Sequence, residues 1–338
     1  MGSKATARDV AREAGVSLAT VDRVLNNRGG VTAEKERAVV MTARRLRLDR
    51  SLDFRAARTL RVAVLVQPPT NPFHAALAAG IEAERQGPNP FNLSFAVTHI
   101  KPDAAPEVAA TIGRVAAHAD ALMICASEQP KIARTLTQVA RQDKPVIALA
   151  TQFGQDVPHI YVGPDNLRAG RVAGDLMGRL VGAKGGDVIL VAGLFSMLGH
   201  AERREGFRAV LAERHPNCRV VAEMESAEDG RRAGELVAAT LACHPDAVGI
   251  YNASAGAREI GAVLQAGERG GAVTFVTHEL TEGRRALLKA GVIDAIIDQD
   301  PALEIRTAVA AIAARFGRLD PGLEMTRTPV QIYMIENC

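Results

Sequence analysis

Residues 18–26 place side chains that can contact DNA bases on one face of a predicted helix. The opposite, apolar stripe of this helix consists of Val21, Val24 and Leu25, at a spacing that turns them inward. On the outer face, Leu18 and Ala19 suit contact with thymine methyl groups, and Arg23 suits guanine O6 and N7 or a phosphate. Asp22 shares this face and can accept a hydrogen bond from a cytosine amine. The pattern predicts a helix that reads a major groove.

Hydroxyl and amide side chains around this helix supply donors for phosphate oxygens and caps for the helices. These residues are Thr6, Ser17, Thr20, Asn26 and Thr32. Thr6 can begin a first helix, Gly15 supplies the left-handed turn that ends it, and Ser17 begins the next helix. Thr32 begins a third helix that reaches about Leu46. The spacing predicts a helix-turn-helix in a three-helix head, with an ordinary packed helix pair as the competing interpretation.

A second group of polar residues follows short apolar runs that are typical of strands. The members of this group are Asn71, Glu128, Asn252, Glu279 and Gln299. Ligands of open parallel sheets bind beyond the carboxyl ends of the strands, and an amide that donates and accepts suits a hydroxyl group. The group therefore predicts a site for a polyhydroxylated ligand. Structural alternatives stay open, because Asn71 can cap the next helix, and Glu128 and Asp165 can serve the fold alone.

One combination of motifs covers the whole head. It consists of Asp9-Val10-Ala11, Ala14-Gly15-Val16-Ser17, Thr20-Val21, Arg23-Val24-Leu25-Asn26 and Val31-Thr32. This combination resembles the head of the lactose/galactose repressor (LacI/GalR) family. The resemblance implies a homodimeric repressor that binds near-palindromic operator DNA and is governed by a small, sugar-like effector held in the core. Asp22 departs from the family, which commonly has a serine that touches phosphate at this position.

The same resemblance implies an effector site in the core. Arg203, followed by x-x-Gly-aromatic, matches the family's effector arginine, and a guanidinium suits paired hydroxyls or a carboxylate. Asn71 and Phe73 match the Asn-Pro-Phe of sugar-binding proteins, in which the amide bonds hydroxyls and the ring stacks on the sugar; packing alone is the alternative for Phe73. Gln299 matches a glutamine that reaches the sugar. The departures at these strand ends are Ala253 and Glu279, where the family commonly has Asp.

An arginine-rich hinge over residues 47–60 separates the head from the core. In the resembled family this segment becomes a short helix on DNA and inserts a leucine into the minor groove. Here that leucine aligns with Ala57, so Leu52 or Phe54 is the candidate for an apolar wedge. A solvated linker that makes weak phosphate contacts is the alternative.

From residue 61 onward, nine short apolar runs alternate with amphipathic segments, which predicts parallel sheets covered by helices on both faces. Nine strands are many for one sheet of this kind, so two lobes are expected. The predicted fold class is an all-α helix-turn-helix head plus a two-lobed α/β core like the type I periplasmic binding proteins. The predicted units are the head 1–46, the hinge 47–60 and the core 61–338. The resemblance to the family and to periplasmic sugar-binding proteins implies that each lobe is discontinuous, with lobe 1 over about 61–163 and 299–325 and lobe 2 over about 164–298 and 326–338.

Composition narrows the possible partners. Residues 1–60 hold 13 Lys and Arg against 7 Asp and Glu, and the rest of the chain holds 28 against 31. A basic head on a slightly acidic core favours a nucleic-acid-binding module. The 4 cysteines form no C-x-x-C pair, and the sequence shows no signal peptide or membrane-length apolar run. We expect a cytoplasmic protein without metal, cofactor or membrane partner, and a dimer because no heptad tail follows the core.

Motifs of common enzymes are absent: no P-loop, G-x-G-x-x-G or nucleophile elbow has the required spacing. We therefore expect no catalytic residue and a repressor of carbohydrate-metabolism genes that a sugar, polyol or sugar acid releases from its operator. An activator, or a repressor that needs a corepressor such as a purine, is the alternative, because the sign of control depends on which lobe geometry the ligand prefers. A free periplasmic binding protein is a third class, which the head and the missing signal peptide oppose.

Overall fold

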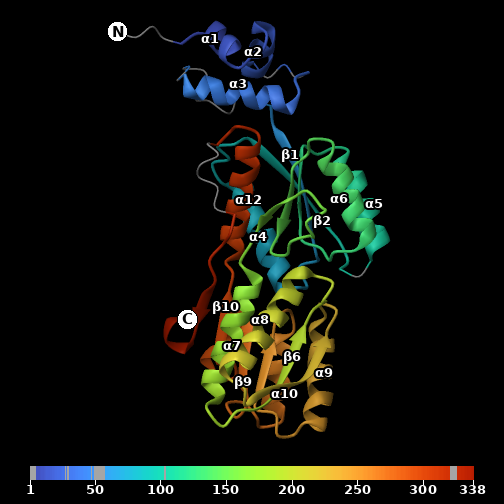
Figure 1. Ribbon diagram of the computed structural model, residues 1–338, viewed down its shortest axis with the longest axis vertical. Helices are drawn as coiled ribbons and strands as arrows, with labels where there is room; N and C mark the ends of the chain where they lie inside the picture. Colours follow the sequence, from blue (N-terminus) through green and yellow to red (C-terminus); the bar gives the residue numbers. More distant parts are fainter. Residues whose placement is uncertain are drawn as a thin grey trace.

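Three short helices form the N-terminal head in the computed structural model, which describes residues 5–26, 28, 30–46, 48, 58–102, 104–319 and 326–338 (Figure 1). They are α1 (Ala7–Glu13), α2 (Leu18–Leu25) and α3 (Ala33–Arg45). Thr6 and Asp9 form a capping box at α1, and Ser17 and Thr32 cap α2 and α3. Gly15 adopts a φ of +65° in the turn between α1 and α2, a conformation that glycine adopts most readily. The predicted helix-turn-helix is confirmed.

A small apolar core fixes the rotation of these helices. Its buried residues are Val10, Ala11, Val21, Val24, Val39, Val40 and Ala43, which come from all three helices. Because Val21 and Val24 enter this core, α2 turns its other face outward.

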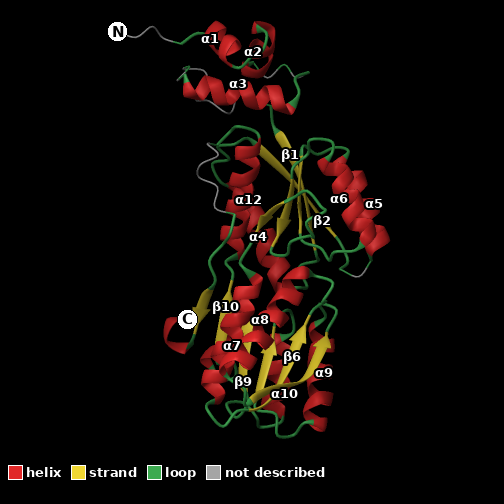
Figure 2. Cartoon of the chain, viewed as in Figure 1, coloured by secondary structure: helices red, strands yellow, loops and turns green. Residues whose placement is uncertain are grey.

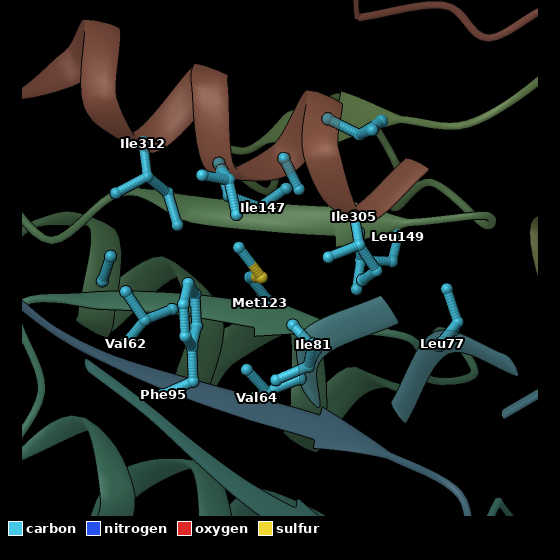
Figure 3. Close-up of a cluster of buried hydrophobic side chains, with 14 of the residues drawn as sticks. Val62, Val64, Leu77, Ile81, Phe95, Met123, Ile147, Leu149, Ile305 and Ile312 are labelled. Atoms are coloured by element: carbon cyan, nitrogen blue, oxygen red, sulfur yellow. The ribbon is translucent and has the colours of Figure 1, made fainter. Parts of the chain in front are cut away.

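Lobe 1 is a parallel sheet in the order β2-β1-β3-β4-β5 with helices on both faces (Figure 2). Its elements are β1 (Leu60–Val66), α4 (Pro72–Gln86), β2 (Leu93–His99), α5 (Ala105–Ala116), β3 (Ala121–Ile124), α6 (Pro130–Ala140), β4 (Val146–Leu149), β5 (Ile160–Val162) and α12 (Pro301–Arg315). α5 and α6 cover one face of the sheet, and α4 and α12 cover the other. Figure 3 shows the second interface, where Ile81 of α4, Met123 of β3 and Ile312 of α12 lie in one apolar cluster.

Lobe 2 is a second sheet in the order β11-β10-β9-β8-β6-β7. Its elements are α7 (Asn166–Val181), β6 (Gly186–Ala192), α8 (Leu198–Arg214), β7 (Cys218–Glu225), α9 (Gly230–Cys243), β8 (Gly249–Asn252), α10 (Ala257–Ala266), β9 (Thr274–His278), α11 (Glu282–Lys289), β10 (Ala295–Asp298), β11 (Gln331–Tyr333) and a 3₁₀ turn, η4 (Ile335–Asn337). All nine apolar runs form strands. The prediction omitted β5 and β11, and β11 is antiparallel to β10, which corrects the expectation of purely parallel sheets.

The chain passes between the lobes at three places. They are residues 163–165, residues 299–300 and the segment that precedes β11. The first and third crossings lie side by side, because the N–H of Gly163 donates to the carbonyl of Thr326 at 3.2 Å and the N–H of Thr328 donates to that of Gly163 at 3.0 Å. α12 therefore returns to lobe 1 after the chain has built most of lobe 2.

The head rests on lobe 1 through α3, with α1 and α2 on the far side (Figure 1). Arg318, just beyond α12, is fully buried, and its Nη2 lies 3.4 Å from Oε1 of Glu36 on α3. Arg58 joins the same cluster, with ion pairs of 3.1 Å to Glu36 and 2.8 Å to Asp120. The contact is close, because a Cβ on Gly317 would lie 3.0 Å from the backbone oxygen of Arg37. No helix in the described part of the chain is long and apolar enough to cross a membrane.

Candidate functional site

α2 presents the side chains that the sequence assigns to base contacts. Its N-terminus is fixed by Ser17, whose Oγ accepts from the N–H of Thr20 at 3.1 Å. Leu18 is 45% exposed, and Ala19 and Arg23 are exposed as well. The outer face of α2 is therefore accessible to a duplex.

The carboxylate of Asp22 is bound by two neighbours. It accepts from Nδ2 of Asn26 at 2.6 Å and from Nη1 of Arg28 at 2.8 Å. The positive charge of Arg28 reduces the repulsion that Asp22 would exert on a phosphate. The remaining candidates are Thr6 and Thr32, whose hydroxyls cap helices, and Leu52 and Phe54, which lie outside the described residues.

A cleft between the lobes brings several predicted ligand contacts together. Phe73, Arg203, Glu279 and Gln299 line one cavity. Arg203 on α8 is 3% exposed. It donates from Nε to Oδ1 of Asn166 at 2.8 Å, from Nη1 to the carbonyl of Ala253 at 3.0 Å and from Nη2 to Oε1 of Gln299 at 3.0 Å. None of these three acceptors carries a formal charge. Gln299 lies at the second crossing between the lobes, and Asn166 directly follows the first.

Glu279 reaches the cavity as half of a buried ion pair. Its Oε2 accepts from Nη1 of Arg284 at 2.9 Å, and both side chains are almost fully buried. Nη2 of Arg284 also donates to the carbonyl of Ser254 at 3.1 Å. Asn252 supports the same turn, because its Nδ2 donates to the carbonyl of Ser254 at 3.0 Å. Asn252 thus positions Ser254, which lines the cavity, and is not itself among the lining residues.

On the lobe 1 side, Asn71 has two tasks. Its Oδ1 accepts from the N–H of Phe73 at 3.1 Å and caps α4, while its Nδ2 donates to Oε2 of Glu228 in lobe 2 at 2.6 Å. The Phe73 ring is 6% exposed and packs edge-on against His74. The packing and capping roles are therefore present, and the sugar contacts of both residues stay predictions.

Glu128 lies outside this cavity. Its Oε2 accepts from the N–H of Gly154 at 2.7 Å, and its own N–H donates to the carbonyl of Ser196 in lobe 2 at 2.8 Å. Asp165 caps α7 through the N–H of Arg168 at 2.9 Å. Both residues fit the structural alternative, in which a buried or capping carboxylate stabilises the fold.

Several lining residues escaped the sequence analysis. They are His74, Cys125, Ala150, Thr151, Met197, Gly199, His200, Glu228 and Ser254. Thr151, Glu228 and Ser254 follow β4, β7 and β8, so the rule that ligands bind beyond strand ends would have found them. His200 lies in the first turn of α8, and the sequence gives no signal for it.

Burial sets the charges of this cavity. It lowers the pKa of His74 and of His200 to about 3, so both imidazoles are neutral. The N–H of Gln67 donates to Nδ1 of His74 at 3.2 Å, which leaves Nε2–H of that ring as a donor. Burial, followed by the charge of Glu279, raises the pKa of Glu228 to about 7.

The cavity is almost closed. Its volume is about 30 Å³, far below the several hundred Å³ of typical ligand sites. A mouth of about 500 Å³ lies next to it, lined by the first turns of α9, α10 and α11 and by Thr70 and Pro72 of lobe 1. Ligand entry therefore requires a lobe movement or a side-chain movement. Among the described residues, no group of His, Cys, Asp and Glu is arranged to hold a metal ion.

Family models match both parts of the chain. The model of the periplasmic binding protein domain matches residues 62–317, and that of bacterial regulatory proteins, lacI family, matches residues 6–46. The chain belongs to the periplasmic binding protein domain family and carries a lacI-family head. This result confirms the resemblance and the fold class expected from the sequence.

Relatives of this chain include regulators. The HTH-type transcriptional regulator DegA of Bacillus subtilis is 26% identical over 214 residues, which cover 62% of this chain and 61% of DegA. The ribose operon repressor of Halalkalibacterium halodurans is 40% identical over 83 residues, 23% of this chain and 24% of the repressor. The matches thus span less than two thirds of either relative.

Solved structures share the fold of the periplasmic binding protein domain. An ABC transporter solute binding protein from Burkholderia graminis in complex with D-arabinose superposes with a TM-score of 0.75 at 20% identity, covering 82% of this chain and 96% of that one. At this identity the likeness concerns the fold alone.

Proposed function

We propose that the protein is a transcriptional repressor of carbohydrate-metabolism genes, which binds operator DNA through α2 and releases it when a sugar-like ligand occupies the cleft. One observation carries the proposal: a single chain joins an exposed helix-turn-helix face to a buried polar cavity between two lobes. DegA and the ribose operon repressor, by their names, control transcription, which supports the same conclusion.

The proposal assigns the protein a binding role and no catalysed reaction, in line with the regulators and binding proteins that it resembles. It acts in the cytoplasm, where operator DNA lies. Two copies pair through their cores, so that two α2 helices meet successive major-groove faces about one helical turn apart. A two-fold symmetric protein then explains a near-palindromic operator.

α12 couples the ligand site in the cleft to the DNA-binding face of the head. The segment that leads into α12 contains Gln299, which accepts from Arg203 in the cleft at 3.0 Å. At the other end of α12, Arg318 lies 3.4 Å from Glu36 of the head. A ligand that binds Arg203 changes the preferred angle between the lobes, and α12 carries that change to α3. The ligand shifts the equilibrium only by its difference in affinity for the two lobe geometries.

The test begins with selection of binding sites from a random duplex DNA library by the full chain. We expect inverted-repeat half-sites, and we expect neutral aldopentoses and aldohexoses in the cleft to weaken binding to the selected duplex by about tenfold or more. Fluorescence anisotropy measures both quantities. Absence of an enriched sequence, or tighter DNA binding with ligand, would contradict the proposal.

Arg23→Ala tests the role of α2. It should weaken binding to the selected duplex by about tenfold or more, because a base-edge or phosphate contact is lost. Arg12→Ala is the matched control, since its side chain is 74% exposed on α1 and its ion pair with Asp9 is local. Equal losses of DNA affinity in the two variants would mean that binding depends only on the net charge of the head.

A further inference from the structure

The loop after β7 holds a carboxylate inside the cleft in a strained conformation. Ala227 and Glu228 have φ of +55° and +64°, which costs free energy for residues other than glycine and is common at functional sites. The loop is clamped by hydrogen bonds of 2.9 Å from the N–H of Ser226 to Ala192 and from that of Ala227 to Gly193. The backbone therefore fixes the direction of the Glu228 side chain.

The two oxygens of Glu228 have different environments. Oε2 accepts from Nδ2 of Asn71 in lobe 1 at 2.6 Å. Oε1 is buried and has no hydrogen-bond partner among the described residues. The nearest basic atom is Nδ1 of His200 at 3.5 Å, which belongs to a neutral ring. Gly193 makes room for this oxygen, because a Cβ there would lie 1.5 Å from it.

Glu228 also separates two spaces. It lines both the inner cavity of about 30 Å³ and the mouth of about 500 Å³. The hydrogen bond from Asn71 holds the carboxyl group at the border that the two spaces share. A monosaccharide must displace or contact this group, because the inner cavity alone is far too small for it.

Few of the N–H donors nearby are free to bind an anion. Glu279 is already paired with Arg284 at 2.9 Å. Arg203 donates three of its five N–H groups to Asn166, Ala253 and Gln299, so at most two N–H groups are available to a ligand. A carboxylate or phosphate in the cavity would meet these two donors but would also meet the lone pairs of Glu228. Above its pKa of about 7 this carboxyl group is ionised, and in a poorly solvated site its repulsion of an anion is then strong.

We propose that Glu228 is the specificity-determining residue of the cleft: its carboxyl group accepts a hydrogen bond from a hydroxyl or ammonium group of the ligand and excludes sugars that bear a carboxylate or phosphate. This inference rests on the proposed function and narrows its ligand class to neutral and amino sugars.

The experiment compares matched ligands on the full chain at a pH above the Glu228 pKa of about 7, where its carboxyl group is ionised. The probes are D-ribose, D-glucose and D-galactose, with D-glucosamine, D-galactosamine, D-ribonate, D-gluconate, D-galactonate, D-ribose 5-phosphate and D-glucose 6-phosphate. Thermal shift detects binding, because a ligand of the native state raises the apparent stability, and calorimetry gives the Kd. We expect shifts from at least one neutral or amino sugar and none from its acid or phosphate.

Glu228→Gln keeps the shape of the side chain and removes its charge. It should improve the affinity for the acid relative to its neutral parent by about tenfold or more. Glu235→Gln is the control, because this glutamate of α9 is 70% exposed and should leave the ratio unchanged. If Glu228→Gln does not fold, Glu228→Ser should relax the same discrimination.

Two results would overturn the inference. The first is an acid or phosphate that binds the wild type as tightly as its neutral parent. The second is a ratio of the acid's Kd to the parent's Kd that differs from the wild-type ratio by no more than about twofold in both Glu228→Gln and Glu228→Ser. If a neutral sugar still binds, these results leave the proposed function intact. A chain that binds no probe overturns the inference and the sugar-responsive part of the proposed function together, while selection of operator DNA tests the repressor part separately.

Discussion

Arg203 is a buried cation held by a backbone carbonyl and two side-chain amides. Arg203→Ala should abolish ligand binding and lower the free energy of unfolding by about 3 kcal/mol, because it leaves the buried acceptors of Asn166 and Gln299 without a partner. Ligand titration and urea unfolding measure the two effects. The adjacent Arg204→Ala is the matched control, since Arg204 is 42% exposed in its ion pair with Glu223. Equivalent behaviour of the two variants would show that Arg203 has no special role.

The buried carboxyl of Glu228 predicts a pH dependence. Its folded-state pKa of about 7 exceeds the ordinary 4.5, so the folded chain binds more protons than the unfolded chain between these values. Its contribution to the free energy of unfolding is therefore full below pH about 4.5 and declines by about 3 kcal/mol as pH rises to about 7.

Urea unfolding of the wild type and of Glu228→Gln at a series of pH values isolates this contribution. The stability of the wild type relative to the variant should fall across that window. A difference that is independent of pH would mean that Glu228 titrates normally. The three buried histidines, whose pKa values are lowered, act in the opposite direction and cancel in the comparison.

The sequence predicted the cleft residues only in part. Arg203 and Gln299 are recognisable by motif and do line the cavity. Asn252 does not line it and instead donates a hydrogen bond to the carbonyl of Ser254, which does. Glu228 follows a strand and could have been found by that position, but an acid in a loop is usually solvated, and only the fold shows that its carboxyl group is buried. Asn71 lies 157 positions away from Glu228 in the sequence, so no local sequence pattern indicates that the two side chains are in contact.

At the scale of elements, two glycines let α7 and α8 approach closely. A Cβ on Gly170 would lie 2.0 Å from the backbone oxygen of Arg203, and one on Gly206 would lie 2.1 Å from that of Leu167. Gly170→Ala should therefore force α8 outward, lower the free energy of unfolding by about 3 kcal/mol and weaken ligand binding by displacing Arg203.

Gly113→Ala in α5 is the control for that prediction. A Cβ at Gly113 meets nothing within 4 Å, so the variant should gain about 0.5–1 kcal/mol from helix propensity. Thermal unfolding measures both variants. A Gly170→Ala chain that is as stable as Gly113→Ala would contradict the close packing of α7 and α8.

Element prediction succeeded where the apolar pattern was long. Runs such as residues 61–67 combine branched side chains with polar flanks and become strands. β5 and β11 have only 3 residues each, and β11 is largely exposed, so neither shows a local pattern. The antiparallel pairing of β11 with β10 follows from the third crossing, which brings the chain back alongside the sheet.

For the whole molecule, the cluster of Glu36, Arg58 and Arg318 predicts how the head responds to the core. Glu36→Gln should loosen α3 from lobe 1, because it removes the acid that both arginines contact. Hydrogen exchange in α3 should become faster. The ligand's effect on DNA affinity should fall from about tenfold to about twofold, because the contact between Arg318, beyond α12, and Glu36 of the head is lost.

Glu13→Gln is the control for this variant. Glu13 pairs with Arg45 at 2.5 Å inside the head, so its loss should leave the coupling unchanged. Unaltered coupling in Glu36→Gln would mean that the hinge between the head and Arg58 carries the effect of the ligand; residues 49–57 of this hinge lie outside the described part of the chain.

The discontinuity of lobe 1 bears on how the chain is synthesised. The head is complete once residues 7–48 have emerged, because its apolar core draws on no segment after Leu48. The apolar face of the lobe 1 sheet, in contrast, lacks the cover of Ile305, Val309 and Ile312 until α12 is made. Domains of a growing chain fold in the order of their completion. A nascent chain therefore completes the proposed DNA-binding surface before it completes the lobes that we propose control it.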